Sequence, residues 1–62
     1  MCETNAFLRH DGKEEMFVES VARIEVKGDM LEITGVFGDR MHLKGRITEI
    51  NFQGGKVFLE RL

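Results

Sequence analysis

The sequence predicts an all-β domain that closes into a small barrel of five or six short antiparallel strands. Apolar and polar residues alternate along several short segments, which is the period of a strand that buries one face. Glycine interrupts this alternation where turns are needed, and proline is absent. No segment has the pattern of a convincing helix. Closure is favoured because it removes the exposed sheet edges that promote aggregation.

The chain begins with a predicted hairpin. Its strands are residues 2–9 and 14–18, and the Asp11-Gly12 pair between them suits a tight turn. The next strand, residues 22–26, also alternates. We expect its inward face to carry Ala22, Ile24 and Val26, and its solvent face to carry Arg23 and Glu25.

Further glycine-containing turns divide the remainder of the chain, at residues 27–29, 37–39 and 53–56. They bound four more predicted strands, at residues 30–37, 40–47, 48–52 and 56–62. In the first of these, Leu31 and Ile33 share the inward face, and Gly35 indicates a bulge or a sharp bend. In the last, Val57 and Leu59 point inward.

The alternation is clearest over residues 40–47. One face carries Met41, Leu43, Gly45 and Ile47, and the other carries Arg40, His42, Lys44 and Arg46. A helix would scatter these residues around its circumference, so this segment is a half-buried strand. Together the strands describe one domain, residues 1–62, of the SH3-like barrel kind.

The length and composition limit the kind of protein this is. A chain of 62 residues hides only about 60% of the surface that its unfolded form exposes, so its core is thin. A single cysteine excludes an intrachain disulfide. Support from a partner chain or a metal is therefore plausible.

Charge and hydropathy exclude several classes. Nine basic residues against eleven acidic ones give a net charge of −2, with no basic excess to attract nucleic acid or an anionic membrane. Residues 2–8 lack the apolar run of a signal peptide, and no stretch approaches the ~20 apolar residues of a membrane span. A lone thiol fits a reducing compartment, so we expect a cytoplasmic protein.

No arrangement of residues indicates an enzyme. The glutamates alternate with cations on outward faces, and there is no signature of a Ser-His-Asp or Cys-His site or of a phosphate-binding loop. The alternative function is an RNA-binding or protein-interaction barrel that uses the Arg40–Arg46 face. That stripe contains no aromatic residue for base stacking, so a solvated strand face is favoured and nucleic acid is not the expected partner.

The only cysteine is the second residue, which favours a chemical role over a structural one. As a structural residue, Cys2 would pack beside Ala6 and Leu8, which lie on the same face of the predicted strand. A second residue this small instead predicts removal of Met1. The mature chain would then begin with a free α-amine and a thiol on Cys2, which together form a five-membered chelate around a metal ion.

Further donors are needed to complete such a site. The backbone amide nitrogen of Glu3 joins the chelate if it is deprotonated, and a planar set of thiolate and nitrogen donors suits Ni(II) or Cu(II) better than tetrahedral Zn(II). One chelate fills only two or three positions, so a two-fold related second chain would supply the rest. Outward apolar residues agree with a homodimer and would form its interface: Phe58, Leu62, Phe7 and Val36.

Neither histidine is expected in this site. His10 lies about 26 Å from Cys2 if the intervening residues are extended at ~3.3 Å per residue. His42 is surrounded by Arg40, Lys44 and Arg46, whose charges oppose metal binding.

The opening MCETNAFL and the following DGKEE resemble the CooT family, small proteins that begin Met-Cys, and the similarity continues through residues 21–50 and the terminal KVFLERL. The resemblance implies an SH3-like or Sm-like barrel and a homodimer that holds Ni(II) at its interface through Cys2 of each chain. It also implies a nickel metallochaperone or maturation factor for carbon monoxide dehydrogenase, with a nickel enzyme or its maturation factors as partners.

Overall fold

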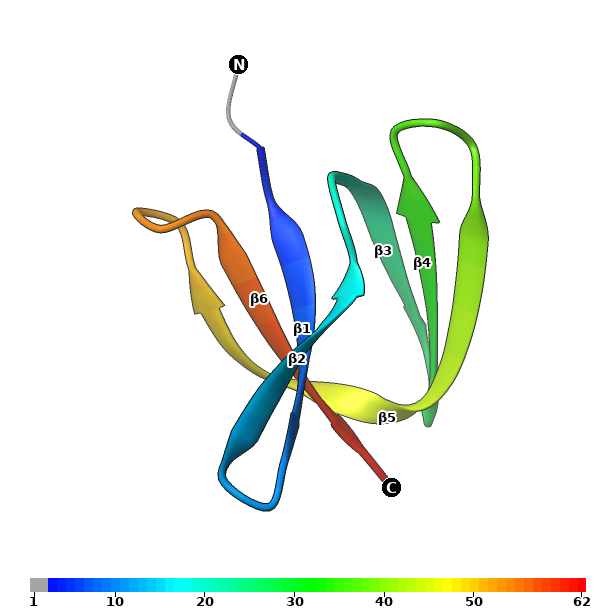
Figure 1. Ribbon diagram of the computed structural model, residues 1–62. Coiled ribbons are helices and arrows are strands. Elements are labelled where there is room, and N and C mark those ends of the chain that lie inside the picture. Colours follow the sequence, from blue (N-terminus) through cyan, green and yellow to red (C-terminus); the bar gives the residue numbers. More distant parts are fainter. Residues whose placement is uncertain (1–2) are drawn as a thin grey trace.

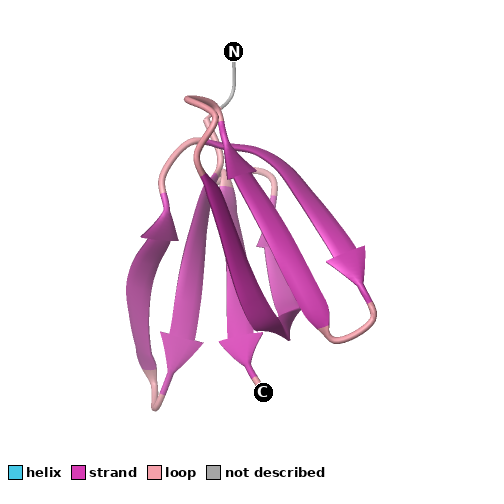
Figure 2. Ribbon diagram, turned by 90° about the vertical axis from the view of Figure 1, so that its right-hand side faces the viewer, coloured by secondary structure: helices cyan, strands magenta, loops and turns pink. Residues whose placement is uncertain are grey.

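The computed structural model describes residues 3–62, which form six β-strands and no helix (Figure 1). The strands are β1 (Asn5–His10), β2 (Lys13–Val18), β3 (Val21–Lys27), β4 (Met30–Gly35), β5 (Arg40–Asn51) and β6 (Lys56–Arg61). The all-β prediction is confirmed, and Figure 2 shows strands joined only by loops. The described residues accordingly include no helix long and apolar enough to cross a membrane.

The strands form one mixed sheet in the order β2-β1-β6-β5-β4-β3. Neighbouring strands are antiparallel except β1 and β6, which run parallel from Asn5 beside Lys56 to Leu8 beside Leu59. The prediction of purely antiparallel strands was wrong for this pair. A tight turn between two strands requires the antiparallel direction, and β1 and β6 lie at opposite ends of the sequence with no such turn between them.

The sheet does not close, which corrects the predicted SH3-like or Sm-like barrel. β2 and β3 are the two edges of the sheet order, although they are separated in the sequence only by Glu19 and Ser20. Ser20 has a left-handed φ of 56°, and the chain turns a corner there instead of folding β3 back along β2 (Figure 1). The backbone groups at this corner bond to other segments: Val21 N–H donates to the Thr4 carbonyl, and Ser20 accepts from Val36 N–H.

Strand β5 links the two halves of the sheet. Its first residues pair with β4 as far as Lys44, and the rest pair with β6 from Gly45 onward. The predicted strands 40–47 and 48–52 are therefore one strand of 12 residues, which curves around the lower end of the molecule in Figure 1. Gly45 lies where the partner changes, and a Cβ there would collide with the carbonyl oxygen of Glu60. The close approach of β5 and β6 thus requires glycine at this position.

The core lies on the concave side of the curved sheet. It consists of Ala6, Val18, Leu31, Ile33, Leu43, Val57 and Leu59, all nearly or fully buried. This set confirms the inward faces predicted for residues 30–37 and 56–62. On the face predicted to be apolar for residues 40–47, Leu43 is buried and Ile47 packs against the core, whereas Met41 is 40% exposed. The glycine-containing turns predicted from the sequence also separate the strands as expected.

The inward face predicted for residues 22–26 is only partly correct. Ile24 packs against the core, whereas Ala22 is exposed and Val26 is 60% exposed. A register shift between Val21 and Arg23 places Ala22 at an irregularity in the ladder with β4. Val26 is exposed because β3 is an edge strand, with no further strand beside it to cover its inward side chains.

A second apolar cluster lies on the opposite face of the sheet and overturns one predicted interface residue. Phe58 points away from the core, as expected, but it is only 5% exposed. The guanidinium carbon of Arg9 lies 4.0 Å from the centre of the Phe58 ring, and Phe7 packs beside it with the ring centres 5.8 Å apart. Phe58 is therefore covered within its own chain and is not available to a partner.

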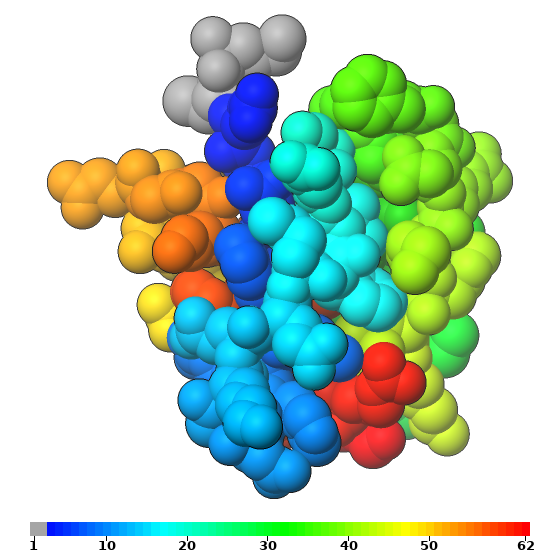
Figure 3. Space-filling model, in the orientation of Figure 1, coloured from blue at the N-terminus to red at the C-terminus, as the bar shows by residue number. Residues whose placement is uncertain are grey.

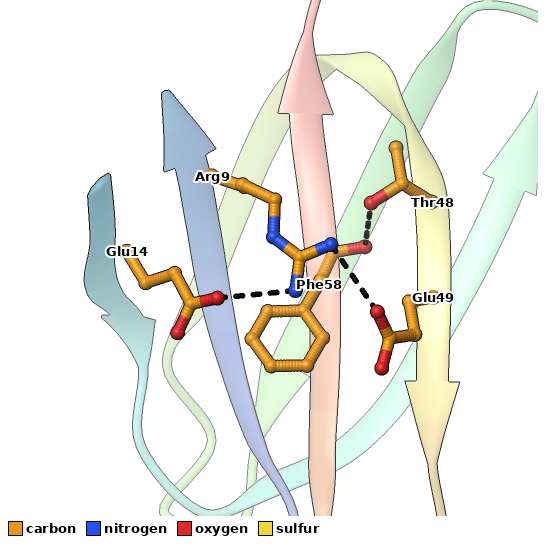
Figure 4. A network of polar contacts seen from close by, with 5 residues as sticks. All are labelled: Arg9, Glu14, Thr48, Glu49 and Phe58. Atoms are coloured by element: carbon orange, nitrogen blue, oxygen red, sulfur yellow. Dashed lines mark hydrogen bonds and ion pairs between the residues drawn. The ribbon is translucent and has the colours of Figure 1, made fainter. Parts of the chain in front are cut away.

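Two carboxylates hold Arg9 in place over this ring (Figure 4). Its guanidinium donates to Glu14 at 3.1 Å and to Glu49 at 3.2 Å, so one side chain links strands β1, β2 and β5 across β6. Loss of hydration acts to lower the pKa of Arg9, but the hydrogen bonds to both glutamates outweigh it and the pKa lies above its ordinary value. The cation is thus kept charged over the aromatic face, where its attraction is strongest.

We predict that Leu59→Ala lowers the free energy of unfolding by about 2–5 kcal/mol, since it removes a fully buried side chain that neighbours cannot readily replace. Leu62→Ala, which truncates a leucine that is 62% exposed, is the matched control and should change it by less than about 0.5 kcal/mol. Urea denaturation followed by circular dichroism measures both values. Equal losses in the two variants would contradict this description of the core.

Candidate functional site

The predicted donors lie at the start of the chain. Cys2 falls outside the described residues, so the prediction for its thiol and amine remains a prediction. Glu3, whose backbone amide is the candidate third donor, is the first described residue and is exposed. What the structure adds is how the residues immediately after these donors are held.

The backbone at Thr4 and Asn5 is fixed on two sides. Asn5 N–H donates to the carbonyl of Gly55 at 2.8 Å, which ties the chain to the turn between β5 and β6. On the other side, Val21 N–H donates to the Thr4 carbonyl at 2.6 Å, and Ser20 N–H donates to the side-chain oxygen of Asn5 at 2.9 Å. Cys2 and Glu3 therefore precede by only a few residues the segment Thr4–Asn5, which three hydrogen bonds hold in place.

Gly55 lies directly against this segment. It has a φ of 65°, and a Cβ built there would collide with the carbonyl oxygen of Glu3. Any other residue at this position would adopt a strained backbone and also displace Glu3. The turn at residues 52–55 thus supplies the surface against which Glu3 lies.

Three turns gather around the start of the chain. Besides the 52–55 turn and the corner at Ser20, the turn at residues 36–39 is connected to the same network, since Val36 N–H donates to the Ser20 carbonyl at 2.9 Å. Figure 3 shows the start of the described chain in blue, with the 52–55 turn in orange on one side and the green turn on the other. We call this end of the molecule the N-terminal end.

The sequence predicts Cys2 and Glu3 as donors but does not single out Asn5 and Gly55, which hold the backbone beside Glu3. The side-chain oxygen of Asn5 accepts a hydrogen bond from Ser20 N–H. The Gly54-Gly55 pair was a visible turn signal, but nothing in the sequence showed that this turn lies against Glu3. That contact joins segments about fifty residues apart, and local patterns carry no such information.

The two histidines lie away from the N-terminal end or are already paired. His10 is at the far end of β1, with its Nε2 3.6 Å from a carboxylate oxygen of Asp11. His42 Nε2 lies 2.9 Å from a carboxylate oxygen of Glu32 on the neighbouring strand. Within residues 3–62, no group of three or more His, Cys, Asp and Glu side chains is arranged to hold a metal ion.

Carboxylates on neighbouring strands break up the cationic stripe of β5. Arg46 pairs with Glu60 of β6 at 3.1 Å, and His42 pairs with Glu32 of β4. Arg23, a possible extension of the stripe, pairs with Glu25 at 3.2 Å. This alternation of charges does not present the continuous positive track that a nucleic-acid backbone requires.

A hollow of 720 Å³ in the described chain also lies away from Glu3. It lies between the β1–β2 turn and the end of β6 and mixes cations with carboxylates, among them His10, Asp11 and Arg61. It opens to solvent and has the charge balance of an ordinary surface. We do not assign it a function.

The chain is similar to known proteins over nearly its whole length. The family model for CO dehydrogenase accessory protein CooT matches residues 1–60. An uncharacterized protein from Methanocaldococcus jannaschii is 32% identical over 60 residues, which is 97% of this chain and 98% of that protein. Another uncharacterized protein, from Archaeoglobus fulgidus, is 35% identical over 43 residues, which is 69% of this chain and 96% of that protein.

A solved structure is also similar. The crystal structure of a protein assigned as CooT from Carboxydothermus hydrogenoformans superposes with a TM-score of 0.91 at 31% identity, covering 98% of each chain. The fold and the start of the chain define a small, open β-sheet protein whose only cysteine stands just ahead of its first strand. The chain belongs to the CooT family of CO dehydrogenase accessory proteins.

The Glu32–His42 pair predicts a pH dependence. The hydrogen bond from His42 lowers the pKa of Glu32 below its ordinary value of 4.5. Partial loss of hydration acts to raise this pKa, and the positive charges of Lys27 and Arg40 lower it further. Since the folded-state pKa is depressed, this carboxylate stabilises the fold above about pH 5, and the contribution disappears as pH falls through the lowered pKa. Glu32→Gln should therefore lower the midpoint of urea unfolding at pH 6 but not near pH 3.

Urea titrations across this pH range, with Glu15→Gln on the edge strand β2 as the control, measure the effect. A difference between wild type and Glu32→Gln that is the same at both pH values would show that Glu32 does not contribute through its charge.

Proposed function

We propose that this protein is a nickel carrier for the maturation of CO dehydrogenase, and that it binds one Ni(II) between two copies through Cys2 of each. The observation that carries the proposal is the position of the only cysteine. It is the second residue of a chain that belongs to a family of CO dehydrogenase accessory proteins, directly ahead of the backbone held at Thr4 and Asn5.

The donor chemistry of Cys2 supports nickel as the cargo. After removal of Met1, the α-amine and the thiolate close a five-membered ring on the ion, and the Glu3 amide nitrogen is placed to extend it. Soft thiolate and nitrogen donors in a plane match the tetragonal preference of Ni(II). A free α-amine and a free thiol ordinarily titrate above neutral pH, and a bound metal ion lowers the pKa of each, so both groups would serve as donors at neutral pH.

The way the chain start is held supports a defined site. Hydrogen bonds at Thr4 and Asn5 and the contact of Glu3 with Gly55 fix the backbone just beyond the donors. A chelate on such a short arm loses less conformational freedom on binding than one at the end of a long disordered tail. Completion of the site by a second copy agrees with the scarcity of other ligands among the described residues.

A carrier role agrees with the family and with the composition. The family is an accessory one, which acts on the maturation of an enzyme, and the proposal assigns no catalytic residue to this chain. The partners are a second copy of the chain and the client CO dehydrogenase or its maturation factors. We place the protein in the cytoplasm, where a lone thiol remains reduced.

We predict that untagged protein, with the loss of Met1 verified by intact mass, binds Ni(II) at one ion per two chains. Cys2→Ser should abolish the binding and leave the fold intact, because the residue lies ahead of the sheet. A Ni(II) titration followed by thiolate-to-nickel charge-transfer absorbance measures the stoichiometry. A band that survives in Cys2→Ser, or no band in the wild type, would refute the proposal.

Gly55→Ala tests the site without touching a donor. A Cβ at residue 55 displaces the Glu3 carbonyl, so the affinity for Ni(II) should fall by roughly 10-fold or more, as it does when residues behind a metal ligand are changed. Gly12→Ala is the matched control because Gly12 also has a positive φ but has open space around it. Equal affinities in these two variants would show that the 52–55 turn does not position the donors.

A further inference from the structure

Two phenylalanines on this molecule are almost completely exposed. Phe37 is 90% exposed and Phe52 is 87% exposed, although the chain has few large side chains with which to build a core. The other phenylalanines, Phe7, Phe17 and Phe58, are buried or half-buried. An exposed phenylalanine ring keeps a large apolar area in water, and two of them at one end of a small protein indicate a surface that meets a partner.

Both residues lie at the N-terminal end, on either side of the start of the chain. Phe37 belongs to the 36–39 turn. In this turn Val36 N–H donates to the carbonyl of Ser20, and the residue after Ser20, Val21, donates to the carbonyl of Thr4. Phe52 begins the 52–55 turn, whose Gly55 bonds to Asn5 and lies against Glu3. In Figure 3 these two turns flank the blue start of the chain.

The length of chain ahead of Glu3 restricts what can meet this end. Cys2 is one residue from Glu3, and one extended residue spans only about 3.3 Å. If one ion is shared by the Cys2 residues of two copies, the Glu3 residues of both copies lie within a few residue lengths of that ion. The two N-terminal ends must then face each other closely, and the turns beside Glu3 enter the contact.

We propose that Phe37 and Phe52 form the contact surface through which a second copy of this chain docks, end to end, around the shared ion. This rests on the proposed function, since it is the sharing of one ion that brings these two ends together. The aromatic contact replaces the predicted interface based on Phe58, which Arg9 already covers.

The available area is consistent with this occupant. Two phenylalanines at this exposure offer roughly 300–400 Å² of apolar surface on each copy. A stable interface buries about 800 Å² on each partner. The half-exposed Val36 and Ile50, which adjoin the two turns, add to the phenylalanine area. Together these side chains offer less than a stable interface buries, so the contact requires the shared ion to hold the two copies together.

Met41, at the start of β5 beside the 36–39 turn, is also exposed and lies at this end. The other exposed apolar residues lie elsewhere. Val26 and Met30 flank the β3–β4 turn, and Leu62 ends the chain; both regions lie at the opposite end of the molecule from Glu3 in Figure 1. Met16 is on the edge strand β2. A dimer built on any of these would leave the two Cys2 residues too far apart to share an ion.

The test compares the double variant Phe37→Ser/Phe52→Ser with Met16→Ser/Leu62→Ser, which removes two exposed apolar residues away from the N-terminal end. Sedimentation equilibrium of the untagged full chain, with one Ni(II) per two chains and again without metal, gives the dissociation constant of the dimer. We expect it to rise at least about tenfold in the Phe37/Phe52 variant, as for central aromatic residues of interfaces. The control variant should match the wild type.

An unchanged dissociation constant in the Phe37/Phe52 variant would overturn the proposal, as would a wild-type protein that is monomeric both with and without nickel. Far-UV circular dichroism checks the fold, and if the double variant is unfolded, Phe52→Ser alone carries the same comparison. A wild type that binds no nickel but dimerises through these phenylalanines would refute the nickel function and support the surface. If the wild type binds one nickel ion per two chains and the phenylalanine substitutions leave the dissociation constant of the dimer unchanged, the nickel function is supported and the proposed contact surface is overturned.

Discussion

The shared use of strand β5 is the constraint on which the rest of this structure depends. A chain this short has one thin core, and neither half of the sheet, β2-β1-β6-β5 or β5-β4-β3, could bury its apolar face alone. Because β5 pairs with β4 through its first residues and with β6 through the rest, the two halves fold toward each other over Leu31, Ile33 and Leu59. The change of partner at Gly45 brings the backbones too close for any side chain.

The opposite face of the sheet supplements this core by an unusual means. The guanidinium of Arg9 lies over Phe58 and is held there by Glu14 and Glu49. The charged group remains hydrated at its edge, and its planar face covers the ring. This arrangement links four of the six strands on the face opposite the core. Phe37 and Phe52 are the two phenylalanines that the fold leaves exposed.

The N-terminal end has a fixed backbone at Thr4 and Asn5, directly after the proposed donors in the sequence. Asn5 and Gly55 hold the first strand beside β6, and this parallel pair brings the start of the chain to the 52–55 turn. Glu3, whose amide is a proposed donor, is exposed and precedes the first strand, so its part in binding an ion need not disturb the core. Such a separation of fold and site would suit the proposed role of a carrier that gives its metal to another protein.

The sequence by itself determined the strands, their turns and most of the core, because alternation and glycine placement act locally. It also indicated Cys2, since the chemistry of a thiol beside a chain terminus needs no fold to be recognised. Only the tertiary structure decided that the sheet stays open, that β1 runs parallel to β6, and that Phe58 is covered while Val26 is not. These outcomes, like the contacts of Asn5 and Gly55 at the candidate site, depend on which distant segments pair, and alternation along a strand reports its faces but not its neighbours.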